Sequence, residues 1–277
     1  MLTSTRFSVG TGKSCVFETD TLSQLTAIVL ESQETSRDDK STAIELDLYV
    51  HLYKCVVQTV VQIDQTKTRC QDWKVRHDDR SYCSLPGRHP QLTFTVLRGD
   101  VRLKLGYSSA MLILERWDLA QMPAGDSATS HQEADYIISL ANGKMRSVAN
   151  RAIEVLSALQ ILTAACGTTP MYDNLLGTYA GVTLAQFADV LTDIRGAADL
   201  MRQVDQQRKS RLRSREPVLT WANSMMQRKS LDLGGADADD HLQVDAEMDW
   251  PRAVQPQDPA SFLDSLITMQ YDDGELQ

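Results

Sequence analysis

The chain has 277 residues, of which 42% are hydrophobic, and it carries a formal net charge of −9. This length is enough for one large domain or two smaller ones. No stretch approaches the roughly 18 consecutive apolar residues of a membrane-spanning helix, and the N-terminus lacks the apolar core of a signal peptide. Glycine (14) and proline (8) are scarce, which favours helix over sheet. We therefore predict an all-α fold, an irregular multi-helix domain with a disordered acidic C-terminal tail.

Residues 1–18 contain the tripeptide GKS, at 12–14, which resembles the end of a phosphate-binding loop. That motif requires another glycine where this chain has Phe7, and it should follow a buried strand and begin a helix. We therefore expect a flexible N-terminus. The alternative is a nucleotide-binding enzyme that uses a degenerate phosphate loop at 8–15, with Asp118 as one carboxylate that could hold magnesium.

After this segment, apolar residues recur at the helical spacing of about 3.6. The spacing predicts a first helix over 19–30, with Asp20 or Thr21 as its N-terminal cap. A long amphipathic helix is expected over 41–63. Residues 64–90 are polar, and we expect them to be irregular.

The second half of the chain predicts longer helices. The expected elements are a buried helix over 91–119, a helix over 132–166, a short turn at 175–179, a helix over 184–204 and a final helix over 217–228. Gly106 weakens the first of these helices but allows another helix to approach closely. Pro217 suits the first turn of the last helix, where its missing N–H is not needed.

The last segment, 231–277, differs in composition from the rest. From Asp237 to Gln277 it holds eleven acidic residues and one basic residue, a net charge of −10, which leaves about +1 for the remainder of the chain. Charge repulsion and few apolar residues predict that this tail is largely disordered by itself. Its apolar side chains, spaced among acids, are candidates for partner binding through an amphipathic helix. They are Trp250, Phe262, Leu263, Leu266, Ile267 and Tyr271.

A basic run, RKSRLRSR, precedes the last predicted helix. Clustered cations of this kind are typical of nuclear import signals and of nucleic-acid contacts. An exposed helix end followed by a turn explains the run equally well. The candidate residues are Arg208, Lys209, Arg211, Arg213 and Arg215.

No recognisable catalytic or metal-binding motif is present. The five cysteines are widely spaced and form no C-x-x-C pair, which argues against a zinc ribbon or a redox motif and favours a reduced, intracellular protein. Cys70, His77 and Cys83 share a polar stretch, but they lack a fourth ligand and the usual zinc spacing. We predict no catalytic residue, no metal and no cofactor in this chain.

Two segments resemble fungal zinc-cluster transcription factors, whose DNA-binding module is a binuclear cluster held by six cysteines. Trp73 followed by SLPG, at 84–87, is similar to a W-then-LP segment of their helical regulatory domain. VRLKLGYSSAMLILERW, at 101–117, is similar to the next helix of that domain. The family's helix ends in Leu-x-Arg-Pro, whereas this chain has LERW at 114–117. The resemblance covers about 41–230.

The resemblance implies a regulator of RNA polymerase II transcription that acts in the nucleus and is not an enzyme. The domain organisation would be a flexible N-terminus at 1–18, a helical regulatory domain at 19–230 and an activation tail at 231–277 that recruits coactivators. The family's zinc cluster has no counterpart in these residues, so zinc and DNA contacts would belong to a domain that is not present here. A homodimer is compatible with this organisation, and no membrane contact is expected. A helical scaffold protein without a role in transcription is the remaining alternative.

Overall fold

The computed structural model describes residues 2–11, 14–58, 62–78, 90–122, 131–166, 171–212 and 217–232. Within these ranges the regular structure is helical, with nine α-helices, one 3₁₀ helix and no strand. The elements are α1 (Leu2–Thr11), α2 (Thr19–Glu31), α3 (Arg37–Val56), α4 (Ile63–Asp78), α5 (Pro90–Ala120), α6 (His131–Cys166), α7 (Met171–Gln186), η1 (Ala188–Val190), α8 (Ile194–Leu212) and α9 (Pro217–Asp232). The predicted all-α class is confirmed.

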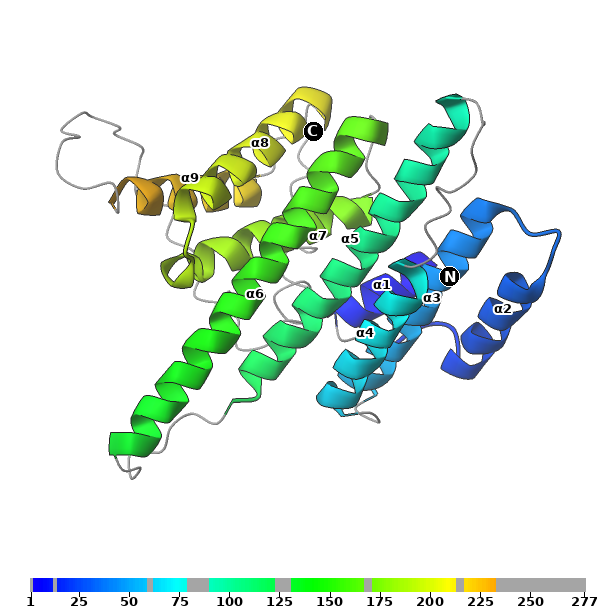
Figure 1. The fold of residues 1–277 in the computed structure, drawn as a ribbon, viewed down its shortest axis with the longest axis horizontal. Helices are drawn as coiled ribbons and strands as arrows, with labels where there is room; N and C mark the ends of the chain where they lie inside the picture. The colour runs from blue at the N-terminus through cyan, green and yellow to red at the C-terminus, as the bar shows by residue number, and fades with distance from the viewer. Residues whose placement is uncertain are drawn as a thin grey trace, which may run out of the picture.

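The two longest helices, α5 and α6, lie side by side at the centre of the body (Figure 1). Their apolar stripes face each other and the neighbouring helices, because both sequences repeat large aliphatic residues at helical spacing. The buried residues of this pair include Leu105, Met111, Leu112, Leu114, Val148, Ala152, Leu156 and Leu159. On one side α3 and α4 pack against α5, and on the other α7 and α8 pack against α6. One hydrophobic cluster therefore connects helices from both ends of the described chain.

Four helices agree with the prediction to within a few residues. They are α2, α5, α6 and α9, the last of which begins at Pro217. Gly106 of α5 also has the predicted role: a Cβ at this position would lie 2.9 Å from Oε1 of Glu45 on α3. The bare backbone at Gly106 thus leaves space for a buried side chain of the neighbouring helix.

The prediction of a flexible segment over residues 1–18 is wrong for residues 2–11, which form α1. Among the described side chains of α1, the buried ones are Leu2, Thr5, Arg6, Ser8 and Val9. Three of these five are polar, so a search for apolar periodicity does not detect the buried face.

The long helix predicted over 41–63 is confirmed over 41–56, but its bounds differ in the structure. Helix α3 starts earlier, at Arg37, where the Ser36 side chain accepts a hydrogen bond from the Asp39 amide at 3.2 Å, and it ends at Val56. The chain then forms α4 within the segment predicted to be irregular. This helix buries a narrow stripe of Thr66, Cys70 and Trp73, of which only Trp73 is large.

The turn predicted at 175–179 and the helix predicted over 184–204 have different bounds in the structure. The turn expected at 175–179 is part of the 16-residue helix α7, which is buried on almost every side and so has no polar–apolar period. The helix expected over 184–204 is interrupted by η1 and starts at Ile194 as α8. At this start Oδ1 of Asp193 accepts a hydrogen bond from the Gly196 amide at 2.8 Å, which caps the new helix.

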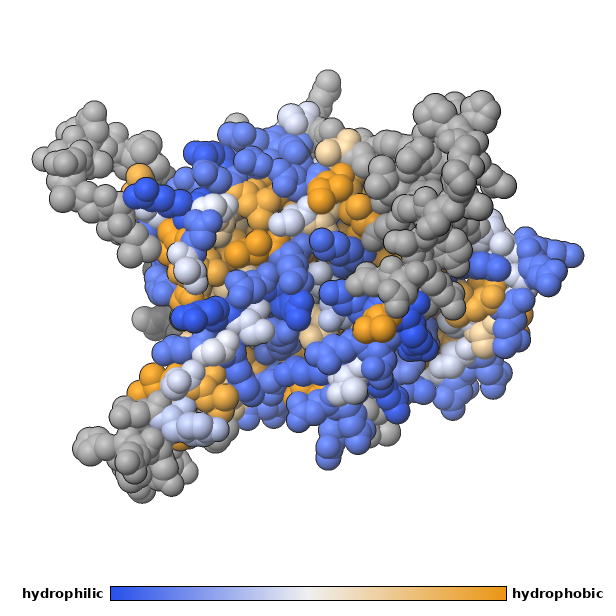
Figure 2. Space-filling model, viewed as in Figure 1, coloured by the Kyte–Doolittle hydropathy of each residue, from blue (hydrophilic) through white to orange (hydrophobic). Residues whose placement is uncertain are grey.

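The face shown in Figure 2 is mostly hydrophilic, with apolar patches between the charged side chains, and one patch lies at the lower left, near the beginning of α6. In this helix the apolar side chains of Ile138 and Leu140 are exposed. None of the described helices combines the length and apolarity needed to cross a lipid bilayer.

Candidate functional site

A groove between α3 and α4 has a volume of about 550 Å³. This volume falls within the range of small-molecule pockets, roughly 300 to 1,000 Å³. Asp47 and His51 of α3 line one side, and Arg69, Asp72 and Arg76 of α4 line the other. The rim therefore carries two acidic and two basic side chains around a histidine.

The buried indole of Trp73 forms the floor of this groove. Its Nε1–H donates a hydrogen bond to the backbone oxygen of Ile44 at 3.0 Å, which ties α4 to α3. Its ring lies parallel to that of Tyr107 on α5, with 6.3 Å between the ring centroids and 2° between the planes. Trp73 thus contacts α5 as well as α3, whereas 84–87, the other part of the segment compared with Trp73 in the sequence, lie outside the described residues.

Two side chains of the groove, Cys70 and His51, have protonation or tautomeric states that the structure indicates. Burial raises the pKa of Cys70 to about 12, so its thiol stays protonated at neutral pH and is a poor nucleophile. Nδ1 of His51 lies 2.8 Å from the backbone oxygen of Asp47, and because that oxygen only accepts, Nδ1 carries the proton. The groove can offer an aromatic floor and paired charges to a ligand.

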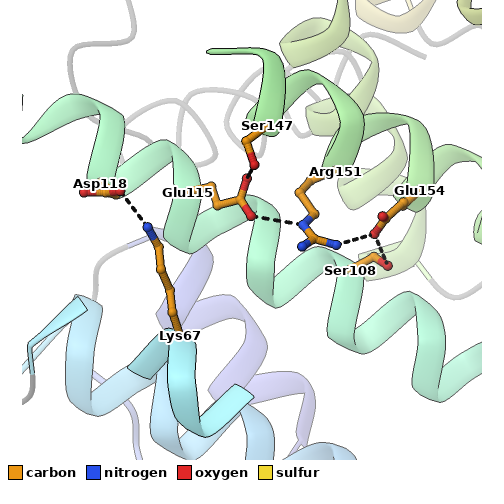
Figure 3. Close-up of polar contacts among 7 residues, drawn as sticks. All are labelled: Lys67, Ser108, Glu115, Asp118, Ser147, Arg151 and Glu154. Atoms are coloured by element: carbon orange, nitrogen blue, oxygen red, sulfur yellow. Dashed lines mark hydrogen bonds and ion pairs between the residues drawn. The ribbon is translucent and has the colours of Figure 1, made fainter. Parts of the chain in front are cut away.

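A network of polar side chains joins α5 to α6 (Figure 3). Glu115 of α5 accepts hydrogen bonds from Ser147 at 2.6 Å and from Nε of Arg151 at 3.0 Å. Arg151 also donates to Glu154 at 2.8 Å, and Glu154 accepts from Ser108 of α5 at 3.3 Å. Burial lowers the pKa of Arg151, but its hydrogen bonds with the two glutamates outweigh this effect and raise the pKa, so the guanidinium remains charged.

Asp118, near the end of α5, connects three helices. Its carboxylate lies 2.6 Å from Nζ of Lys67 on α4 and 2.9 Å from Nζ of Lys144 on α6. Burial raises the pKa of Asp118, yet the two lysines outweigh this and lower it below its usual value. A carboxylate held between two ammonium groups is poorly placed to bind magnesium, the role considered for it with a phosphate loop.

The surroundings of the GKS tripeptide also differ from those of a phosphate loop. Gly12 and Lys13 lie outside the described residues, but a helix precedes them, and the next helix begins only at Thr19. The amide of Cys15 donates to the hydroxyl of Tyr53 at 2.9 Å and is not directed at an anion. The described residues on both sides therefore do not form the strand–loop–helix geometry that this motif needs.

The basic run predicted for nuclear import or nucleic-acid contact is only partly exposed. Arg208 is 4% exposed, and its guanidinium donates hydrogen bonds to Thr178 at 3.2 Å and to the side chain of Asn174 at 3.0 Å. The prediction that it belongs to an exposed run is therefore wrong for this residue. Lys209 is more exposed and pairs with Asp205 at 2.8 Å. The side chains of Arg211, Arg213 and Arg215 lie outside the described residues.

The predicted partner-binding residues lie outside the described part of the chain as well. They are Trp250, Phe262, Leu263, Leu266, Ile267 and Tyr271. The same holds for the side chains of His77, Cys83 and Cys166, while Cys55 and Cys70 are buried in the core. Among the described residues, no three His, Cys, Asp or Glu side chains lie close enough to share a metal ion.

The groove was not predicted from the sequence, because the polar composition of 64–90 indicated an irregular segment. One signal was present: Asp47 and His51 are four residues apart on the predicted helix and therefore share a face. Arg69 and Arg76, seven residues apart, share a face only once α4 is known to be helical.

Comparisons of the chain with protein-family models, with curated proteins and with solved structures returned no match.

Proposed function

We propose that this chain is a regulatory module of a fungal zinc-cluster type transcription factor. In this proposal the helical body restrains or transmits a signal, and the acidic tail recruits coactivators of RNA polymerase II transcription in the nucleus. Zinc and direct DNA contacts are assigned to residues that this sequence does not contain.

The observation that carries the proposal is the division of charge along the chain. Residues 237–277 have a net charge of −10, whereas the remaining residues together are close to neutral. Within this acidic segment, Trp250, Phe262 and Leu266 are spaced among carboxylates, a composition typical of activation segments that fold against a partner. A tail that served only solubility would not need these large apolar residues.

The organisation of the body is in keeping with a module that acts through contacts. Its half-buried charges connect helices to one another: Glu115 and Arg151 join α5 to α6, and Asp118 joins α4, α5 and α6. Trp73 of α4 and Tyr107 of α5 stack and so join these two helices. Such a body can serve as a folded unit to which the tail is attached, while the surface of the body contacts other proteins.

The experiment fuses the full chain to a heterologous DNA-binding domain and measures a reporter gene. We expect activation, and we expect the triple substitution Phe262→Ala, Leu263→Ala and Leu266→Ala to abolish it, because the tail would lose its apolar contacts with coactivators. The matched control replaces three polar residues of the same tail, Gln243, Gln255 and Gln257, with alanine and should leave activation unchanged.

An inert fusion that is expressed at normal levels and reaches the nucleus would contradict the proposal. Exclusion of the tagged full chain from the nucleus would favour a scaffold outside transcription. Nucleotide binding that is lost with Lys13→Ala would favour the phosphate-loop alternative.

A further inference from the structure

A cluster of buried charges lies where α1 meets α3 and α7. The side chain of Arg6 on α1 is 4% exposed, and those of Glu45 on α3 and Asp173 on α7 are 1% and 2% exposed. The guanidinium pairs with Glu45, and its Nη1 lies 3.5 Å from Oδ1 of Asp173. A cation is thus held between two buried carboxylates from different helices.

Two tyrosines complete the surroundings of this cation. Cζ of Arg6 lies 5.4 Å from the ring centroid of Tyr49 and 5.2 Å from that of Tyr172. The two rings meet edge to face, with 6.4 Å between their centroids. Both distances to the guanidinium are within the range of cation–π attraction. The Tyr172 hydroxyl also donates a hydrogen bond to the backbone oxygen of Arg6 at 3.2 Å.

We call this set of residues, Glu45, Tyr49, Tyr172 and Asp173, the guanidinium socket. All four come from α3 and α7, and none comes from α1. A second arginine, Arg102 of α5, lies 3.4 Å from Glu45, but its side chain is 34% exposed and it sits at the edge. Without Arg6 the socket would hold two buried carboxylates against one partly solvated cation, and a buried charge that has lost its partner is strongly destabilising.

Few of the described side chains of α1 are both apolar and buried. They are Leu2 and Val9, while Thr5, Arg6 and Ser8 are polar and buried. A ten-residue helix rich in serine and threonine is not stable alone in water. The contacts of Arg6 with the socket therefore help to hold α1 beside α3 (Figure 1).

We propose that the guanidinium socket is a binding site for a guanidinium group, which α1 fills in cis through Arg6. Planar, weakly hydrated guanidinium fits two carboxylates and two aromatic faces better than an ammonium ion does. The inference is independent of the proposed role in transcription, because it concerns only how the body accepts an arginine. An arginine presented by another polypeptide has the chemistry to compete for the same socket.

The test uses the full chain with the substitution Arg6→Ala and the small probe ethylguanidinium chloride at millimolar concentration. Loss of the buried pair should lower the melting temperature, followed by circular dichroism, by about 10 °C. Ethylguanidinium should restore part of this loss in a saturable manner, because a ligand that binds only the folded state stabilises it. Ethylammonium chloride at the same concentration should restore much less.

Three controls define the outcome. The wild-type chain and the exposed variant Arg202→Ala should not respond to ethylguanidinium. The double variant Arg6→Ala/Glu45→Gln should lose most of the response, because one carboxylate has been neutralised. If Arg6→Ala is unfolded at 25 °C, the probe should restore its helical circular dichroism. Equal effects of the two probes, or no effect of ethylguanidinium on the folded or unfolded variant, would overturn the proposal.

Discussion

At the scale of single residues, the charged groups around a carboxyl decide its role in this protein. Asp118 and Asp173 are both removed from bulk water, and burial alone would raise the pKa of each. At Asp118 the contacts with Lys67 and Lys144 reverse this effect and lower the pKa. At Asp173 burial prevails over the more distant charges of Arg6 and Arg102, so its pKa is raised. Of these two carboxyl groups, only that of Asp118 therefore stabilises the fold when it is ionised.

This difference predicts how the variant Asp118→Asn responds to pH. A carboxyl whose pKa is lowered on folding contributes stability above its unfolded pKa of about 3.9, and the contribution is lost as pH falls through the folded pKa. At pH 7 we expect the variant to be less stable by about 1 kcal/mol, because two lysines lose their acceptor. The difference in the free energy of unfolding between the wild-type chain and the variant should stay constant from pH 7 to about pH 5 and then decrease as the pH falls further.

Urea unfolding of the full chain at several pH values, followed by circular dichroism, measures this gap. The control is Asp199→Asn, which removes a more exposed partner of Arg202 and should change stability by less than about 0.5 kcal/mol at any pH. A gap for Asp118→Asn that persists unchanged below pH 4 would mean that ionisation of this carboxyl is not what stabilises the fold.

At the scale of helices, the pattern of side chains explains which elements the sequence could predict. Helices α5 and α6 were predicted because aliphatic residues such as Leu112 and Leu156 repeat along their buried faces. Helices α1 and α4 were missed because Arg6 and Thr66 occupy inward positions where a periodicity search expects apolar residues. The groove between α3 and α4 was missed for the same reason, since two thirds of its lining residues belong to α4.

Contacts between residues that are distant in sequence explain why other features of the structure were not predicted. Arg6 can be buried on α1 because Glu45 and Asp173, which lie 39 and 167 positions further along the chain, neutralise it. Trp73 can anchor a largely polar helix because Ile44 accepts its N–H and Tyr107 covers its ring. No local pattern contains this information, so it becomes visible only when the helices are placed in three dimensions.

The distance between neighbouring helices predicts how alanine substitutions at two glycines change the stability of the chain. A Cβ at Gly177 of α7 would collide with Cδ2 of Leu159 and would lie 3.3 Å from Nη2 of Arg208, whereas a Cβ at Gly143 of α6 meets nothing within 4 Å. Alanine favours a helix over glycine by about 1 kcal/mol. Gly143→Ala should therefore stabilise the chain by up to this amount.

Gly177→Ala should instead destabilise the chain by about 1–3 kcal/mol, because overpacking exceeds the gain in helix propensity. Thermal or urea unfolding of the two variants provides the comparison, and each serves as the control of the other. Stabilisation by both substitutions would show that α6 and α7 can move apart at little cost, contrary to the tight contact at Gly177.

At the scale of the whole molecule, the hydrophobic core and the net negative charge lie in different parts of the chain. The hydrophobic cluster draws residues from Leu2 of α1 through to Met226 of α9, so both ends of the described chain take part in a single folded body. The charge of the molecule is concentrated elsewhere, in residues 237–277. The proposal assigns stability to the body and activation to the tail, and it therefore requires that the two can be separated.

Deletion of residues 236–277 tests this requirement. The free energy of unfolding should change by less than about 0.5 kcal/mol, because the proposal gives the tail no part in the core. Thermal unfolding of the shortened chain beside the full chain measures the change. The substitution Leu219→Ala in α9, at a site with 0% exposure, shows that the assay responds, since it should destabilise the full chain by about 2–5 kcal/mol. If the deletion destabilises the chain as much as this core substitution does, the tail is part of the folded structure. Its apolar residues would then be needed for packing, and they would not be free to bind a coactivator.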